Sequence, residues 1–84
     1  MMSVHPSRPM VRRDELVGML ASAVGEAPVQ AAVDRACEAL ALPADRWTVA
    51  DALKILEHLA ESPGLLGITA RFVKTRAILS WGRR

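Results

Sequence analysis

The sequence predicts an all-α protein, a small four-helix domain with short loops and a flexible N-terminal tail. Apolar residues recur at helical spacing in four segments, and prolines or glycines separate these segments. No segment shows the strict alternation of a surface strand, so no strand is expected. A chain of 84 residues suits one domain, and we place the tail at residues 1–10 and the helical domain at residues 11–84.

The first helix is expected at about 11–24. Asp14 and Glu15 suit the positive N-terminal end of a helix, and either Ser7 or Asp14 could be the N-cap. Gly25 is a natural stop because glycine readily adopts the left-handed conformation beyond a helix end. The expected core face consists of Leu16, Met19, Leu20 and Ala23.

The second helix is expected at about 28–41, with Pro28 in its first turn and Pro43 closing the segment. The short connection between the first two helices predicts that they are antiparallel neighbours. The expected core stripe consists of Val29, Val33, Ala36 and Leu40, with Cys37 at its edge. Cys37 is therefore expected to be a small core residue rather than a nucleophile.

The third helix, at 48–61, has the clearest amphipathic pattern in the chain. Thr48 is suited to cap its N-terminus, and the preceding Trp47 is expected to pack back on the first turns as a hydrophobic staple. Pro63 ends the helix because it disfavours a helical backbone at the residue before it. The expected core stripe consists of Val49, Leu53, Leu56 and Ala60.

The fourth helix has two possible starts. It either has Pro63 in its first turn and runs to about 81, or begins near Ile68 after a loop. Gly67 favours the later start, because a glycine inside a helix costs about 1 kcal/mol. The apolar residues of this helix form two stripes. The stripe expected to face the core consists of Leu65, Ile68, Phe72 and Leu79. The stripe expected to remain uncovered consists of Leu66, Ala70, Val73, Ala77 and Trp81.

Charge is unevenly distributed along the chain. Residues 26–61 contain seven acidic and three basic side chains, whereas residues 62–84 contain five basic side chains and no acidic one. The formal net charge of +2 therefore combines an acidic middle with a basic C-terminal segment.

Few residues suggest catalysis or metal binding. The sequence has no glycine-rich phosphate loop, no Cys-x-x-Cys motif and no closely spaced pair of histidines. We therefore expect no enzyme activity, no cofactor and no metal. A single cysteine suits a reducing compartment, and no apolar run is long enough to span a membrane, so a cytoplasmic location is expected.

The expected function is protein–protein interaction or dimerisation, as in an adaptor or a regulatory protein. The core is expected to be thin and rich in alanine, and the second apolar stripe of the fourth helix indicates an interface. Ile55 and Leu59 would extend this apolar surface at the edge of the third helix. The partner would be a second copy of the chain or an acidic protein surface. The candidate partner-binding residues are Leu66, Ala70, Val73, Lys74, Ala77, Trp81 and Arg84.

The alternative function is nucleic-acid binding through the basic C-terminal segment. The side chains that would reach phosphates are Arg71, Lys74, Thr75 and Arg84. Residues 52–65 resemble the first helix of winged helix-turn-helix repressors, but the two further helices of such a domain are not expected after them. A basic amphipathic helix can also lie on an anionic membrane, and the position of Arg76 between the two apolar stripes argues against this.

Overall fold

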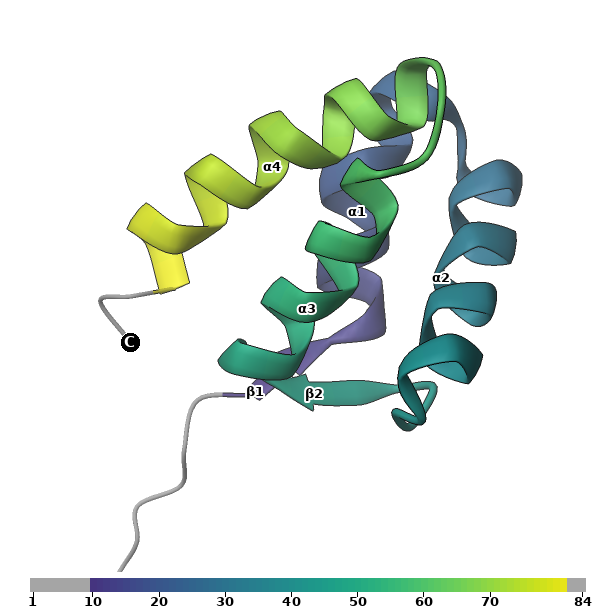
Figure 1. Ribbon diagram of the computed structural model, residues 1–84. Helices are drawn as coiled ribbons and strands as arrows, with labels where there is room; N and C mark the ends of the chain where they lie inside the picture. The colour runs from purple at the N-terminus through teal and green to yellow at the C-terminus, as the bar shows by residue number, and fades with distance from the viewer. Residues whose placement is uncertain (1–9, 82–84) are drawn as a thin grey trace, which may run out of the picture.

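Four helices and one short β-ribbon make up the computed structural model, which describes residues 10–81 (Figure 1). The elements in chain order are β1 (Met10–Arg12), α1 (Arg13–Val24), α2 (Glu26–Leu40), β2 (Arg46–Thr48), α3 (Val49–Ala60) and α4 (Leu65–Trp81). The predicted four-helix architecture is confirmed for the described part of the chain. The ribbon was not expected from the sequence.

The ribbon consists of β1 and β2, which pair in antiparallel orientation. Val11 lies opposite Trp47 in this pairing, and both side chains are buried beneath the helices. Each strand has only three residues, which is too short for alternation to stand out from the sequence. The expectation of no strand is therefore wrong. Met10 belongs to β1 rather than to the predicted tail, and residues 1–9 of that tail lie outside the described residues.

The turn between α1 and α2 consists of Gly25 alone. Its φ of 98° lies in the region that favours glycine, which confirms this residue as the stop of the first helix. Because the turn is so short, α2 already begins at Glu26, and the two helices run alongside each other in opposite directions (Figure 1). At the other end of α2, Ala41 has a φ of 57°, and the amide of Leu42 donates to the carbonyl oxygen of Cys37 at 2.9 Å.

The start of α3 has the predicted cap. The amide of Asp51 donates to the hydroxyl oxygen of Thr48 at 3.1 Å, which confirms Thr48 as the N-cap. Trp47 is buried just before the cap, as expected of a residue that packs on the first turns. Its indole N–H donates to the carbonyl oxygen of Pro43 at 2.6 Å, so the buried ring keeps a hydrogen bond.

The fourth helix begins at Leu65, between the two predicted starts, and contains Gly67 in its first turn. Gly67 is buried, and a Cβ added there would collide with the carbonyl oxygen of Ser62. The chain between α3 and α4 therefore passes so close to α4 that a side chain at this position is excluded. The close approach explains why the helix contains a glycine despite its poor helix propensity.

The core lies between α1, α2 and α3, and α4 and the ribbon complete it (Figure 1). Its largest buried side chains include Trp47, Leu16, Leu20, Ile55 and Leu56. Alanine contributes several of the remaining buried positions, as the composition predicts: Ala32, Ala36, Ala52, Ala70 and Ala77. Because alanine fills little volume, the helices must approach one another closely to close the core.

Arg13 fastens the start of α1 to α2 and to the loop before β2. Its guanidinium donates to the side-chain oxygen of Gln30 at 2.7 Å, to the carbonyl oxygen of Ala44 at 2.9 Å and to a carboxylate oxygen of Asp34 at 2.7 Å. Its backbone amide donates to the carbonyl oxygen of Asp45 at 2.8 Å. One side chain thus holds three segments together at the end of the molecule where the ribbon lies.

Candidate interaction surface

The stripe of α4 that was expected to meet a partner is instead packed inside the monomer. Ala70, Val73, Ala77 and Trp81 have at most 5% of their surface exposed, and Leu66 is partly buried against the same core. The assignment of this stripe to the uncovered face is therefore wrong. The stripe rich in small residues faces inwards because Ala70 and Ala77 let α4 lie close to α1 and α3, which a row of large side chains would prevent.

The other predicted surface residues also need correction. Ile55 and Leu59 of α3 are buried in the core, so they do not extend an exposed apolar surface. Lys74 is half-buried, and its Nζ lies 2.9 Å from Oε2 of Glu57 on α3, which makes it part of an ion pair within the monomer. Arg84 lies outside the described residues.

The stripe that was expected to face the core is the exposed one. The exposed fractions are 56% for Leu65, 54% for Ile68, 69% for Phe72 and 66% for Leu79. Ile78 is a further large apolar residue on this helix with about half of its surface exposed. Single exposed apolar residues are common, but several of this size on one helix indicate an interaction surface.

The spacing of these residues indicates what kind of surface this is. Leu65, Ile68, Phe72, Thr75 and Leu79 follow one another at alternating intervals of three and four residues. This interval is the a and d pattern of a heptad repeat, in which one helix packs against another helix. We call these five residues the heptad seam. At about 100° per residue, the seam lies on the side of α4 opposite the buried stripe, so the other helices of the monomer leave it open.

Two arginines flank the heptad seam. Arg71 and Arg76 are exposed on either side of Phe72 and Thr75, and neither takes part in an ion pair between residues 10 and 81. No acidic residue occurs in α4. The charges that α4 itself places beside the seam are therefore positive, whereas the centre of the seam is apolar.

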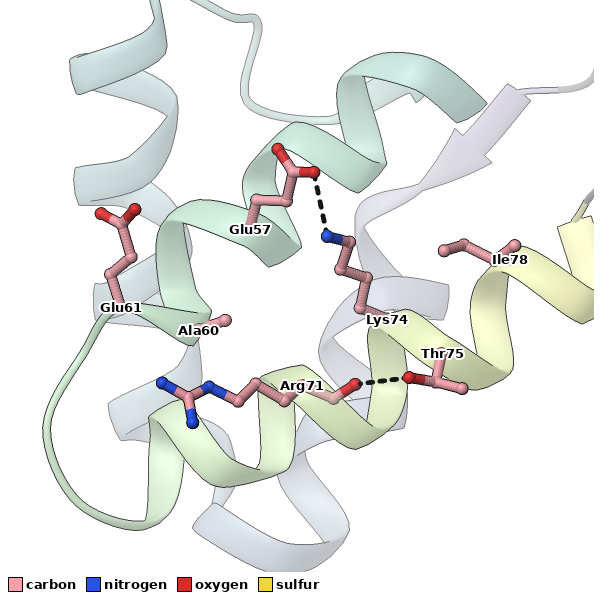
Figure 2. Close-up of a pocket in the computed structure, with 7 residues that line it drawn as sticks. All are labelled: Glu57, Ala60, Glu61, Arg71, Lys74, Thr75 and Ile78. Atoms are coloured by element: carbon pink, nitrogen blue, oxygen red, sulfur yellow. Dashed lines mark hydrogen bonds and ion pairs between the residues drawn. The ribbon is translucent and has the colours of Figure 1, made fainter.

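An open groove lies beside the heptad seam, between α3 and α4 (Figure 2). Its volume is about 530 Å³, and its lining consists of Glu57, Ala60, Glu61, Arg71, Lys74, Thr75 and Ile78. Within it, the Thr75 hydroxyl donates to the carbonyl oxygen of Arg71 at 3.2 Å, a bond back to its own helix. The groove thus places the carboxylates of Glu57 and Glu61 on the same side of α4 as Arg71 and Ile78.

The thiol of Cys37 is in a structural position. Cys37 is 5% exposed, which confirms it as a core residue. Burial raises the pKa of the Cys37 thiol, and the nearby positive charge of Arg13 partly opposes this effect. Between residues 10 and 81, no group of three or more His, Cys, Asp and Glu side chains is placed to hold a metal ion.

Comparisons with protein-family models, with curated proteins and with solved structures find no match to this chain. Inference about its function therefore depends on its own surface. Among the described helices, none combines the length and the apolar character that a membrane crossing requires.

Proposed function

We propose that this protein is a non-enzymatic, cytoplasmic interaction module that binds a partner helix along the heptad seam of α4. The observation that carries the proposal is the exposure of Leu65, Ile68, Phe72 and Leu79 at heptad spacing on a helix whose opposite face already closes the core. Exposed apolar side chains of this size gain most from burial against another apolar surface, because burial removes them from water.

The flanking charges support the same proposal. Arg71 and Arg76 lie where the e and g residues of a paired helix contact the partner, and such residues set partner choice and orientation. The partner surface would therefore combine an apolar stripe with acidic residues on its edges. This arrangement suits an adaptor or a regulatory protein.

Nucleic-acid binding is the weaker alternative. A phosphate-binding surface depends on several cations that are free to reach the backbone of the nucleic acid. Here Lys74 is already paired with Glu57, and Glu61 lines the groove beside Arg71. Between the two arginines lies the large apolar ring of Phe72, which phosphate binding would leave without a role.

Photo-crosslinking tests the proposed function. A photoreactive phenylalanine analogue replaces Phe72 in the full chain, and the control places the same analogue at Arg35, an exposed residue of α2. Irradiation in the cells that express the protein should give one discrete protein adduct from position 72 and none from position 35. Adducts at both positions, or adducts with nucleic acid or lipid alone, would contradict the proposal.

A further inference from the structure

The partner of the heptad seam can be specified further. We infer that the partner is a second copy of this chain and that the two α4 helices pack side by side in antiparallel orientation. This inference rests on the proposed function. In this arrangement Ile68 of one copy lies beside Leu79 of the other, and Phe72 lies beside Thr75. The a residues of each helix then meet the d residues of the other, which forms one continuous seam with Phe72 against Thr75 in its two central layers.

The area of the exposed surface is sufficient for such a dimer. Leu65, Ile68, Phe72, Ile78 and Leu79 are each exposed by about half to two thirds. On a scale of about 150–200 Å² for a large apolar side chain, they present about 500 Å² per copy. If all of this surface were covered, two copies would bury about 1,000 Å² of apolar surface, which is close to the smallest area expected of a biological interface.

The arginines decide the orientation. In a parallel pair, a residue at g lies beside the e residue five positions further along the partner, so Arg71 would face Arg76 of the second copy. Two such contacts between like charges would oppose the pairing. In an antiparallel pair, the g edge of one helix faces the g edge of the other, and Arg71 lies near Ile78 of the second copy instead.

The groove beside α4 adds charge complementarity to the antiparallel arrangement. The edge of the seam that carries Arg71 and Ile78 also carries the carboxylates of Glu57 and Glu61 (Figure 2). When this edge meets the same edge of a second copy, each side brings the guanidinium of Arg71 and the carboxylate of Glu61, beside the ion pair of Lys74 with Glu57. Because a two-fold interface places the same surface on both partners, a surface with both signs of charge on one edge suits pairing with itself.

Sedimentation equilibrium of the full chain tests the dimer. The wild-type protein should show about twice the monomer mass of 9.1 kDa at high micromolar concentration. Phe72→Glu should weaken self-association by at least roughly thirty-fold, because a large aromatic side chain at the centre of an interface is a typical hot spot. Leu79→Glu provides a second variant with the same expected result. A wild-type protein that stays monomeric at millimolar concentration, or a dimer that both variants leave intact, would overturn the inference.

Disulfide cross-linking tests the orientation. An equimolar mixture of Ile68→Cys and Leu79→Cys should form a mixed covalent dimer under mild oxidation, whereas each variant alone should not. In the antiparallel pair, two copies of either position are about 16 Å apart along the helix axis. The wild-type protein, with only the buried Cys37, is the control. Cross-links within each variant alone would show a parallel pair, and no cross-link in the mixture would overturn the proposed pairing.

Sedimentation equilibrium and the photo-crosslinking experiment together separate this inference from the proposed function. A monomeric chain whose position 72 cross-links to a different protein would refute the dimer and leave the interaction module standing. A monomeric chain that instead sediments with vesicles of phosphatidylcholine and phosphatidylserine, and gives no protein adduct, would refute both.

Discussion

Phe72 and Val73 are neighbours in the chain with opposite environments, so replacing each with glutamate tests the orientation of α4. The exposed fraction is 69% for Phe72 and 5% for Val73. Val73→Glu removes the burial of an apolar side chain, worth about 1.5–3 kcal/mol, and directs a carboxylate towards the core, which adds about 2 kcal/mol or more. Phe72→Glu loses only the buried third of the ring, about 60 Å² or roughly 1.5 kcal/mol.

The two losses of free energy should be compared with the total stability of the domain. A folded chain of this length has a free energy of unfolding of about 4–13 kcal/mol. Val73→Glu is therefore expected to remove about 3–6 kcal/mol, which is a large part of the total. Each kcal/mol lowers the melting temperature of such a domain by about 4–8 °C.

Thermal unfolding followed by circular dichroism measures the difference. The protein should be at low micromolar concentration or below, so that self-association contributes little to the melting temperature. Val73→Glu should melt at least about 15 °C below wild type or show no cooperative transition, and Phe72→Glu should stay within about 10 °C of wild type. Equal melting temperatures, or a lower one for Phe72→Glu, would show that the stripe containing Val73 faces outwards.

Three further predictions concern the fold and its titration. Gly67→Ala should lower the melting temperature despite the better helix propensity of alanine, because the added Cβ would collide with the backbone of the preceding turn. As the control, Gly18→Ala on the exposed face of α1 should stabilise the domain by about 0.5–1 kcal/mol. Arg13→Met should lower the free energy of unfolding in denaturant titrations by about 2–3 kcal/mol, because it removes four hydrogen bonds. Arg12→Met at an exposed position should change this free energy little. Equal effects of the two substitutions would contradict the proposed role of Arg13 in holding the three segments together. Because burial raises the pKa of the Cys37 thiol, the folded protein holds this proton more tightly than the unfolded chain. Its contribution to stability is therefore present below the ordinary thiol pKa of 9.0 and lost as pH rises above it, and Cys37→Ala should remove this part of the pH dependence of the free energy of unfolding.

The sequence was most informative where one short-range signal decided the local structure. Thr48 caps α3 as predicted because its hydroxyl needs only the nearby amide of Asp51. Gly25 ends the first helix because few other residues adopt its φ. Cys37 is buried because it belongs to a single apolar stripe with no competing face.

The sequence failed where two alternatives looked alike locally. Both stripes of α4 are apolar at helical spacing, so periodicity could not decide which one faces the core. Size was the overlooked signal: Ala70 and Ala77 allow close packing, whereas Phe72 and Leu79 do not fit between closely packed helices. The exposed seam was visible as a heptad pattern in the sequence, but its exposure depends on tertiary packing.

Glycine at position 67 was also misread, for a related reason. Its helix propensity argued for a loop, whereas the close approach of the chain near Ser62 requires a residue without a side chain. Such a requirement depends on the path of a different segment, so local propensity does not reveal it.

The ribbon between β1 and β2 has a consequence for how the chain folds. It joins Val11 to Trp47, so α1 and α2 together form a closed loop of about 36 residues, and closing such a loop costs about 3 kcal/mol of chain entropy. A helical hairpin that needed only its own contacts would avoid this cost and could fold early. Here β1 gains its buried contacts only when β2 pairs with it. Folding of α1 and α2 is therefore expected to be coupled to that of α3, and a fragment that ends before β2 should not retain the native hairpin.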